Sequence, residues 1–407
     1  MAEKKILAIE YACEPNKGSE PGVGWNWSKI ISEVPGYDLT VVTRANNKPV
    51  IDEYKKEHPD FKVKFEYYDL PDWILRFKNK DKAIVLFFSL WQRGVIKFIK
   101  KNINLEDYDL VWDFNFGSLN LPVFTYKLKK EYIVGPVSTK KKIPNAYIRQ
   151  TGLVQKTKYV IKQFFKEHLG LNPFAWKTMK RAEKIILCNE IYRDYLPKDQ
   201  QPKAEIVFHN GIDEKGAVSF GEDNLSKGPF KFIFAGRLID SKNLEVAIRA
   251  LKIVKDKGID FTYTIVGDGP LGKKLKKLTT KLGLDDNIEF ISRVKQSDLF
   301  KLYYENEYFL FPSILEISST SMMEAIYFGL KPICFDIMGM DYVLNDAPVL
   351  KMKVTSPKND IDQIANIILD LAKNRKPVDR QQLHDFARQN YMWSDREKDI
   401  KEILEKI

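Results

Sequence analysis

Short strand-like runs alternate with helix-like runs along most of the chain, and this alternation limits the possible folds more than any other feature. Strands that alternate with helices form parallel sheets covered by helices, and their buried position makes them nearly continuous apolar runs. The sequence therefore predicts an α/β fold. In the first half we expect strands at Lys5–Tyr11, Leu39–Thr43, Val63–Tyr68, Leu110–Phe114, Tyr132–Pro136, Lys184–Cys188 and Glu205–His209, with helical stretches such as Gly24–Glu33 and Lys82–Lys101.

The alternation stops at a polar stretch, Gly211 to Gly228, and then begins again. A chain of 407 residues is also too long for one compact core. We therefore expect two doubly wound, Rossmann-like domains, 1–210 and 211–389, that face a central cleft, with ligands bound at loops after strands. The second domain is predicted to contain strands Phe230–Ala235, Tyr263–Val266, Ile288–Ile291, Tyr308–Phe311 and Pro332–Phe335, and helices Leu244–Lys255, Leu271–Leu282, Ser297–Tyr304 and Thr320–Phe328.

Composition excludes several classes of protein. Three scattered cysteines do not make a disulfide framework, and with four histidines and no CxxC pair they do not suggest a zinc site. The N-terminal apolar run is too short for a signal peptide. The uncharged run Ala83 to Gln92 is far shorter than the about 20 residues that cross a bilayer. We therefore expect a cytoplasmic protein without an integral membrane segment and without a metal.

The positive charge is concentrated in one part of the chain. Residues 121–180 contain 13 basic and 2 acidic side chains, whereas the flanking regions are balanced. Leu153 to Lys166 reads as an amphipathic helix with Val160, Ile161, Phe164 and Phe165 on one side and Lys158, Lys162 and Lys166 on another. Such a window either faces anions, for example a phospholipid or a diphosphate-bearing acceptor, or is a solvated lysine-rich face. No nucleic-acid-binding signature accompanies it.

A glycine-rich segment, Gly18-Ser-Glu-Pro-Gly-Val-Gly-Trp25, follows the first strand. We expect its three glycines, Gly18 and Gly22 among them, to precede a helix and to let backbone N–H groups approach a phosphate. The spacing differs from the dinucleotide fingerprint G-x-G-x-x-G. A plain tight turn explains the glycines equally well.

The second domain opens with a cation pair. Arg237 and Lys242 follow the strand Phe230–Ala235 and its terminal Gly236. The guanidinium can bind two phosphate oxygens and the ammonium can add a point charge, so both could stabilise a diphosphate leaving group. Further along, Val266-Gly-Asp-Gly-Pro270 predicts a tight turn in which Gly267 serves the backbone or a ligand.

Two carboxylates, Glu316 and Glu324, flank a serine-rich segment after the strand Tyr308–Phe311. Ser318, Ser319 or Thr320 can cap the following helix, whose N-terminus attracts anions. The carboxylates can accept hydrogen bonds from sugar hydroxyls. Glu324 can also be read as a glutamate favoured by the helix dipole alone. Asp107-Tyr-Asp109 precedes its strand, so we interpret it as a solvated turn and not as a metal motif.

The ordered set of these motifs resembles the retaining GT-B glycosyltransferases of family four. The resemblance is carried by Gly236-Arg237-x4-Lys242, Val266-Gly-Asp-Gly-Pro, Glu316-x7-Glu324 and the N-terminal glycine segment, with Asn210-Gly-Ile-Asp213 leading into the linker. It implies a GT-B fold and a metal-independent enzyme without a cofactor. The donor would be a nucleotide-diphosphate sugar, UDP more readily than GDP. The acceptor would be a glycan or a lipid-linked molecule in polysaccharide or glycoconjugate synthesis.

The resemblance also implies roles for individual residues. Arg237 and Lys242 would hold the diphosphate, Glu316 would face the donor sugar, and Glu324 would bind the ribose. The roles of further residues follow in the same way: Gly267 lies in the donor loop, backbone at Ser319, Thr320 and Ser321 would contact phosphate, Arg293 and Val294 would border the base, and Gly18 and Gly22 would approach the donor. A C-terminal helix, 390–407, would cross back onto the first domain.

One departure from the resemblance leaves an alternative open. Many relatives carry a histidine after the fourth strand, where this chain has Asp113-Phe-Asn115-Phe-Gly117. Either Asp113 or Asn115 takes that role, or the role is absent and the chain is a non-catalytic GT-B-like binding subunit of a glycosyltransferase complex. A nucleotide-sugar epimerase would keep the fold but explains the basic window 121–180 poorly. The protein is expected either free in the cytoplasm or attached peripherally to the inner face of the membrane.

Overall fold

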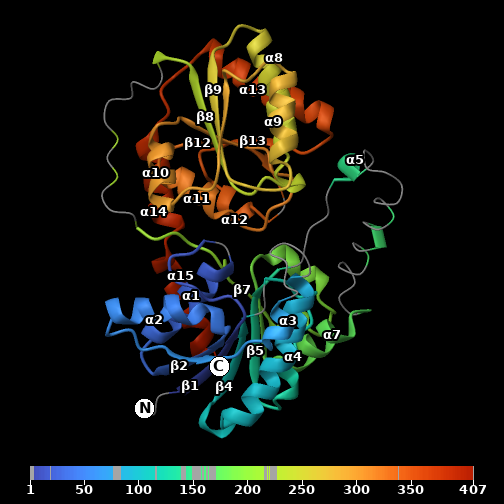
Figure 1. Cartoon of the computed structure of the whole chain (residues 1–407), viewed down its shortest axis with the longest axis vertical. Helices are drawn as coiled ribbons and strands as arrows, with labels where there is room; N and C mark the ends of the chain where they lie inside the picture. The colour runs from blue at the N-terminus through green and yellow to red at the C-terminus, as the bar shows by residue number, and fades with distance from the viewer. Residues whose placement is uncertain are drawn as a thin grey trace. The chain divides into compact units, whose positions relative to one another are not determined.

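The computed structural model describes residues 4–18, 20–76, 84–114, 117–138, 144–148, 157, 160–161, 164, 171–214, 218, 220, 227–337 and 339–406 (Figure 1). The chain divides into two compact units. Unit 1 consists of Met1–Lys140, Tyr159–Asn210 and Trp393–Ile407, and unit 2 consists of Lys141–Lys158 and Gly211–Met392. Of the segment 141–158, which the sequence analysis places in the first domain, the described residues 144–148 and 157 belong to unit 2.

Unit 1 is built on a seven-stranded sheet in the order β3-β2-β1-β4-β5-β6-β7, in which every pairing is parallel. The strands are β1 Lys4–Glu10, β2 Tyr37–Thr43, β3 Lys64–Tyr67, β4 Leu110–Phe114, β5 Tyr132–Val137, β6 Lys184–Leu187 and β7 Ala204–Ile206. The helices are α1 Glu20–Glu33, α2 Lys48–Glu57, α3 Asp72–Leu75, α4 Ile84–Asn102, α7 Pro173–Arg181 and α15 Trp393–Glu405.

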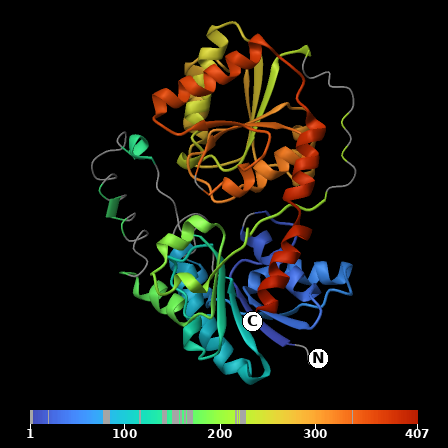
Figure 2. The same ribbon diagram turned by 180° about the vertical axis from the view of Figure 1, so that it is seen from behind.

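The C-terminal helix α15 is part of unit 1, although unit 2 precedes it in the sequence (Figure 2). Its residues Ile400, Ile403 and Leu404 are buried in the same apolar cluster as Trp27 of α1. The Tyr37 hydroxyl donates a hydrogen bond of 2.8 Å to the carbonyl of Leu404. Helix α15 thus completes the core of unit 1.

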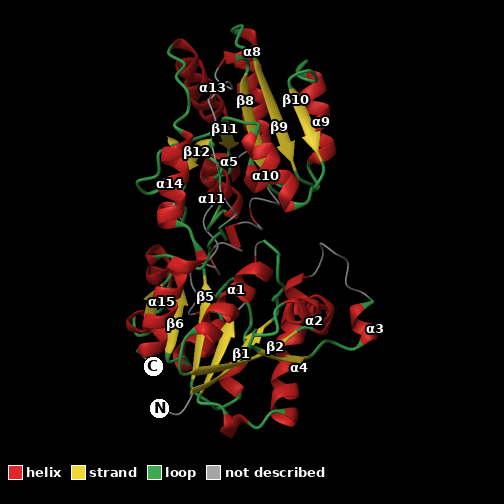
Figure 3. Cartoon of the chain, turned by 90° about the vertical axis from the view of Figure 1, so that its left-hand side faces the viewer, coloured by secondary structure: helices red, strands yellow, loops and turns green. Residues whose placement is uncertain are grey.

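Unit 2 is built on a six-stranded sheet, also parallel throughout, in the order β10-β9-β8-β11-β12-β13. Figure 3 shows the strands of each unit together with their helices. The strands are β8 Phe230–Ala235, β9 Phe261–Val266, β10 Ile288–Ile291, β11 Tyr308–Phe311, β12 Lys331–Asp336 and β13 Leu350–Lys353. The helices are α5 Asn145–Ile148, α8 Leu244–Asp256, α9 Gly272–Lys281, α10 Gln296–Tyr304, α11 Thr320–Tyr327, α12 Asp341–Leu344, α13 Pro357–Lys373 and α14 Arg380–Asn390.

Two parallel α/β sheets agree with the predicted fold class, and the predicted strands overlap the observed ones. The sequence analysis missed β13 and did not place α13 or α14. Residues 350–353 alternate between buried and exposed positions at the sheet edge, so they lack the continuous apolar run of the inner strands.

The glycine segment of unit 1 differs from the prediction. Helix α1 begins at Glu20, so Gly22 and Gly24 lie inside the helix and do not precede it. A side chain at Gly22 would collide with the carbonyl of Lys17, and one at Gly24 would collide with the carbonyl of Ala12. These glycines therefore serve close packing of α1 against the loop after β1, which sequence spacing alone did not reveal.

A carboxyl group is buried beneath this helix. Glu10, at the end of β1, is fully buried and accepts a hydrogen bond from the Ser28 hydroxyl. Burial raises the pKa of Glu10 from 4.5 to about 8, although hydrogen bonds from Ser28 and Cys13 act in the opposite direction. At neutral pH the Glu10 carboxyl therefore holds a proton in the folded protein.

This burial makes the stability of unit 1 depend on pH. Between about pH 4.5 and 8 the folded state binds a proton that the unfolded state has lost, so the free energy of unfolding falls as the pH rises. Glu10→Gln removes that titration, and we expect a shallower fall from about pH 5 to about pH 8. Urea unfolding followed by tryptophan fluorescence measures this, because all seven tryptophans lie in unit 1. If the free energy of unfolding changes with pH in the same way in wild type and in Glu10→Gln, the protonated state of Glu10 is contradicted. The matched control is Glu33→Gln, at the exposed end of α1.

Candidate functional site

The motifs of the second half meet at one edge of the unit 2 sheet, where the parallel strands end. The Gly236 N–H donates to the Val266 carbonyl at 3.0 Å, and the Gly267 N–H donates to the Ile291 carbonyl at 2.9 Å. Backbone hydrogen bonds thus join the segments that follow β8, β9 and β10. The carboxyl edge of a doubly wound sheet is where such folds bind ligands.

Glycine at 267 is required by this close approach. Gly267 has φ +139°, and a Cβ atom there would overlap the carbonyl oxygen of Gly236. A Cβ at Gly269 would overlap the carbonyl oxygen of Leu238 in the same way. The structure thus gives Gly267 a backbone role, and its predicted ligand contact stays a prediction.

Lys242, which we expect to hold the diphosphate, and Glu316, which we expect to face the donor sugar, form an ion pair. They follow the strands β8 and β11 of Figure 3. Their side chains are only 14% and 12% exposed. The Ser313 hydroxyl donates to Glu316 Oε1 at 2.8 Å, and the ammonium of Lys242 lies 4.7 Å from the centre of the Phe311 ring. The ion pair therefore connects the loop after β8 to the loop after β11. The Ile314 N–H connects the same two loops by donating a hydrogen bond of 2.9 Å to the Ser241 carbonyl.

Glu324 is the fifth residue of α11 and is 7% exposed. Its Oε1 accepts a hydrogen bond of 2.7 Å from the amide of Gln296, the first residue of α10. Ser319 is the N-cap of α11, and its side chain accepts from the Met322 N–H at 3.3 Å. The N-terminus of α11 thus lies on the same edge as the Lys242–Glu316 pair, and its dipole favours an anion there.

The other predicted donor residues of unit 2 are more exposed. Arg237 follows Gly236 with an exposed side chain, and Arg293 follows β10 with an exposed side chain and a backbone N–H that donates to Asp268 Oδ2 at 3.1 Å. Val294 is half-buried beside Arg293. Thr320 and Ser321 are the first residues of α11. Gly18 and Gly22 belong to unit 1 and are described there.

Three residues that the sequence analysis did not single out support this edge. Asn243, next to Lys242, has a left-handed backbone with φ +54°, and its amide donates to the Tyr147 hydroxyl at 2.9 Å. The Tyr147 hydroxyl in turn donates to Asp360 Oδ2 at 2.7 Å, and the buried Asp360 carboxylate also accepts from Thr355. No local signal links Tyr147 to Asn243, because they are 96 positions apart in the chain.

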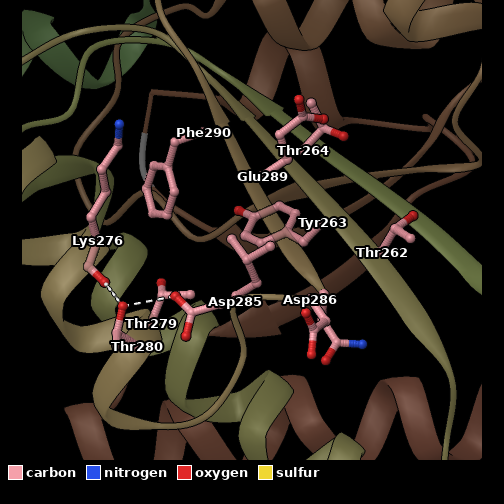
Figure 4. Close-up of a pocket in the computed structure, with 12 residues that line it drawn as sticks. Thr262, Tyr263, Thr264, Lys276, Thr279, Thr280, Asp285, Asp286, Glu289 and Phe290 are labelled. Atoms are coloured by element: carbon pink, nitrogen blue, oxygen red, sulfur yellow. Dashed lines mark hydrogen bonds between the residues drawn. The ribbon is translucent and has the colours of Figure 1, made fainter.

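A cavity of about 590 Å³ lies elsewhere in unit 2 (Figure 4). It is lined by residues of β9, β10 and α9 and of the loop before β10, including Thr262, Lys276, Asp285 and Glu289. The Thr280 hydroxyl donates to Asp285 Oδ1 at 2.7 Å beside it. The lining includes Thr262 and Ile288 at the beginnings of β9 and β10, whereas doubly wound sheets bind ligands at the carboxyl edge, so the size of this cavity does not make it the ligand site.

In unit 1, the segment at the end of β4 that the sequence analysis compares with a histidine position of the resembled family begins with a core residue, Asp113. Asp113 is fully buried and accepts a hydrogen bond from the Thr125 hydroxyl. Burial raises its pKa to about 7, while Thr125 and Gln92 act in the opposite direction. Asp113 is therefore a core carboxyl and not an exposed substitute for that histidine. Asn115, the other candidate, lies outside the described residues.

The basic window is described only in part. Val160, Ile161 and Phe164 are helical and 48–55% exposed, whereas Phe165 and the lysines at 158, 162 and 166 lie outside the described residues. Within the described part of the chain, no helix is long and apolar enough to cross a membrane. The same part of the chain contains no group of three His, Cys, Asp or Glu side chains arranged to hold a metal ion.

Comparisons with known proteins agree with this arrangement. Residues 218–390 match the family model described as glycosyl transferases group 1. The chain is 26% identical over 236 residues to the putative colanic acid biosynthesis glycosyltransferase WcaL of Escherichia coli, covering 53% of this chain and 56% of WcaL. It is 23% identical over 397 residues to the uncharacterized glycosyltransferase MJ1069 of Methanocaldococcus jannaschii, covering 94% and 93% of the two chains. The chain spans between 38% and 56% of three curated relatives that it matches, WcaL among them.

The solved structures show the fold. Anabaena HepE in complex with UDP-glucose superposes with a TM-score of 0.62 at 15% identity, over 99% of this chain and 100% of that chain. The chain has the GT-B fold, as predicted.

Gly267 and Gly258 of unit 2 differ in the space around them, and this difference tests the close backbone approach at the carboxyl edge. Gly267→Ala adds both an unfavourable φ and a steric overlap with Gly236, whereas Gly258 has φ +77° and open space around it. We expect Gly258→Ala to cost about 1–2 kcal/mol and Gly267→Ala to cost about 1–3 kcal/mol more. Differential scanning calorimetry measures both. Equal melting temperatures for the two variants would contradict the close approach.

Proposed function

We propose that this chain is a retaining glycosyltransferase that moves a hexose or an N-acetylhexosamine from a nucleotide-diphosphate sugar to a glycan or lipid-linked acceptor. The observation that carries the proposal is the meeting of Lys242, Glu316, Glu324 and the N-terminus of α11 on one edge of unit 2. Cations and a helix N-terminus suit a diphosphate, and carboxylates suit sugar hydroxyls. The match of residues 218–390 to glycosyl transferases group 1 supports the same reaction class.

In the proposed donor complex, Lys242 and Arg237 neutralise the diphosphate. The N–H groups at Ser319, Thr320 and Ser321 add the positive end of the α11 dipole. In this proposal the side chains and backbone of the protein neutralise the charge of the diphosphate, without a metal or a cofactor. As negative charge grows on the leaving phosphate, these donors stabilise the transition state more than the ground state.

The two glutamates divide the recognition of the donor. Glu324 of α11 is held by Gln296 at the start of α10 and accepts hydrogen bonds from the ribose hydroxyls. Glu316 faces the donor sugar, and Arg293 and Val294 border the base. UDP is favoured over GDP, and the UDP-glucose bound by HepE supports that choice.

The retaining mechanism that we propose is a front-face displacement. The bond between the anomeric carbon and the diphosphate breaks as the acceptor oxygen forms a bond on the same face. The acceptor proton passes to the leaving phosphate oxygen. In this scheme no side chain becomes covalently attached to the sugar.

The acceptor side of the proposal concerns unit 1 and the window 121–180. Exposed Val160, Ile161 and Phe164 beside a run of lysines suit the interface of an anionic membrane or a lipid-linked diphosphate acceptor. We therefore place the protein in the cytoplasm with peripheral attachment to the inner membrane face, in polysaccharide or glycoconjugate synthesis.

The second candidate is a non-catalytic GT-B-like subunit that binds the donor without transferring it. Its support is the burial of Asp113, which leaves the histidine position of relatives without an exposed charged substitute in the described residues. Release of UDP from UDP-glucose by purified protein, above the rate of a Glu316→Gln variant, distinguishes the enzyme from the binding subunit.

Donor binding predicts a thermal shift. UDP at about 100 times its Kd should add about 2.7 kcal/mol to the free energy of unfolding, which raises Tm by roughly 5–10 °C for a domain of this size. Arg237→Ala and Glu324→Ala should abolish most of the shift, whereas Lys252→Ala, on the exposed side of α8, should retain it. Calorimetry is the appropriate measurement, because unit 2 contains none of the seven tryptophans. An unchanged shift in both site variants would exclude this donor assignment, and a panel of UDP- and GDP-sugars then selects the nucleotide.

Membrane attachment has its own matched test. Charge reversal of Lys158, Lys162 and Lys166 to Glu should lower binding to phosphatidylglycerol vesicles at least about tenfold, and salt should weaken wild-type binding. Reversal of Lys273, Lys277 and Lys281, which have the same spacing on α9, is the control for net charge. Flotation of the protein with the vesicles measures the partition. Equal losses in both triple variants would show a general charge effect and contradict a specific surface.

A further inference from the structure

A small cavity lies at the carboxyl edge of the unit 1 sheet. Its volume is about 20 Å³. The cavity is lined by Ala12 after β1, Phe114 at the end of β4, Pro136 near the end of β5, His209 after β7, and Glu20, Val23 and Gly24 of α1. The ends of four parallel strands thus surround it, which is the position where doubly wound sheets bind ligands. A volume above about 10–15 Å³ accommodates one water or one hydroxyl group.

The Glu20 carboxyl group is the acidic side chain of this cavity. It lies against Gly117, which has φ +61° and where an added Cβ would lie 2.5 Å from Glu20 Oε1. Only glycine allows the carboxyl to lie so close to this backbone. Within the described residues no ion pair to Glu20 is found, and burial alone raises its pKa to about 7. Among the described residues, the carboxyl is placed by its packing against Gly117.

Two titratable groups near Glu20, His209 and Cys188, are neutral at physiological pH. Burial lowers the pKa of His209 to about 4, so its imidazole is uncharged. Burial also raises the pKa of the Cys188 thiol after β6, and the charge of Glu20 adds to that rise. The His209 carbonyl accepts a hydrogen bond of 3.0 Å from the Trp27 indole, which fixes this side of the cavity. A carboxylate among neutral groups repels phosphate and suits an uncharged hydroxyl group.

We propose that this cavity is the hydroxyl-binding subsite of unit 1, in which the Glu20 carboxylate accepts a hydrogen bond from one hydroxyl group of the sugar acceptor. The inference rests on the proposed glycosyl transfer. In this proposal Glu20 of α1 recognises a neutral sugar hydroxyl. The groups of unit 2 and of the window 121–180 are proposed instead to bind anions. Glu20 orients this hydroxyl, and the proton lost in transfer still goes to the leaving phosphate.

Water is the smallest hydroxyl compound that fits the cavity, so hydrolysis of the donor is the probe reaction. The wild type, Glu20→Gln and Glu20→Asp are compared for UDP release from the UDP-sugar that gives the largest thermal shift. We expect Glu20→Gln to lower the hydrolysis rate at least about tenfold, with the Kd for UDP unchanged within about twofold. The wild-type rate should rise with pH through about 7, where the carboxyl loses its proton, and this limb should be absent in Glu20→Gln.

The controls separate this inference from the proposed function. Glu33→Gln changes an exposed glutamate at the other end of α1 and should leave the rate and the pH profile unchanged. If the wild type neither binds nor hydrolyses any UDP- or GDP-sugar, the proposed function fails and this subsite fails with it. If the wild type hydrolyses a donor and Glu20→Gln matches its rate and pH profile, only the subsite is overturned, and the cavity holds a structural water. A parallel loss of UDP affinity in Glu20→Gln would likewise overturn it, because that outcome indicates a general structural defect.

Discussion

The ion pair between Lys242 and Glu316 is the interaction on which the carboxyl edge of unit 2 depends. Two charges that are each less than one-sixth exposed are costly to bury unless they meet each other and further hydrogen bonds. Ser313 and the Phe311 ring supply such contacts. Without a donor the pair compensates its own charges. In the proposed complex the diphosphate competes for the ammonium, and the released carboxylate becomes an acceptor for sugar hydroxyls. In this scheme the Lys242–Glu316 pair stabilises the carboxyl edge by itself and separates when an anion binds Lys242.

How much could be predicted from the sequence depends on whether the signal was local. The inner strands were predictable because burial on both faces makes them apolar runs, and Glu316 and Glu324 were found because one strand-loop-helix segment carries both. The start of α1 was misjudged, since Gly22 and Gly24 look like loop residues until the carbonyls of Lys17 and Ala12 are seen against them. The chain of hydrogen bonds from Asn243 through Tyr147 to Asp360 could not be predicted, because its members come from three distant segments.

Buried carboxyls in unit 1 share one physical cause but differ in their surroundings. Burial raises the pKa of Glu10, Asp113 and Glu20 alike. The first two accept hydrogen bonds from Ser28 and Thr125 inside the core, so their burial is explained by packing. Glu20 instead borders a cavity at the end of the sheet. A raised pKa is therefore no guide to function by itself, and the role proposed for Glu20 rests on its place in the lining of this cavity.

The charges of the two units suit different parts of one transfer reaction. Unit 2 presents Lys242, Arg237 and the α11 N-terminus, which attract a diphosphate, whereas the cavity in unit 1 is lined by Glu20 and the neutral His209 imidazole, a combination that repels an anion. A donor that carries two phosphates is thereby directed to unit 2, and a neutral hydroxyl to unit 1. Because Glu20 becomes an anion only near neutral pH, its preference for a hydroxyl over a phosphate strengthens as the pH rises through about 7. Specificity in this scheme comes from electrostatic exclusion at one sheet edge as much as from attraction at the other.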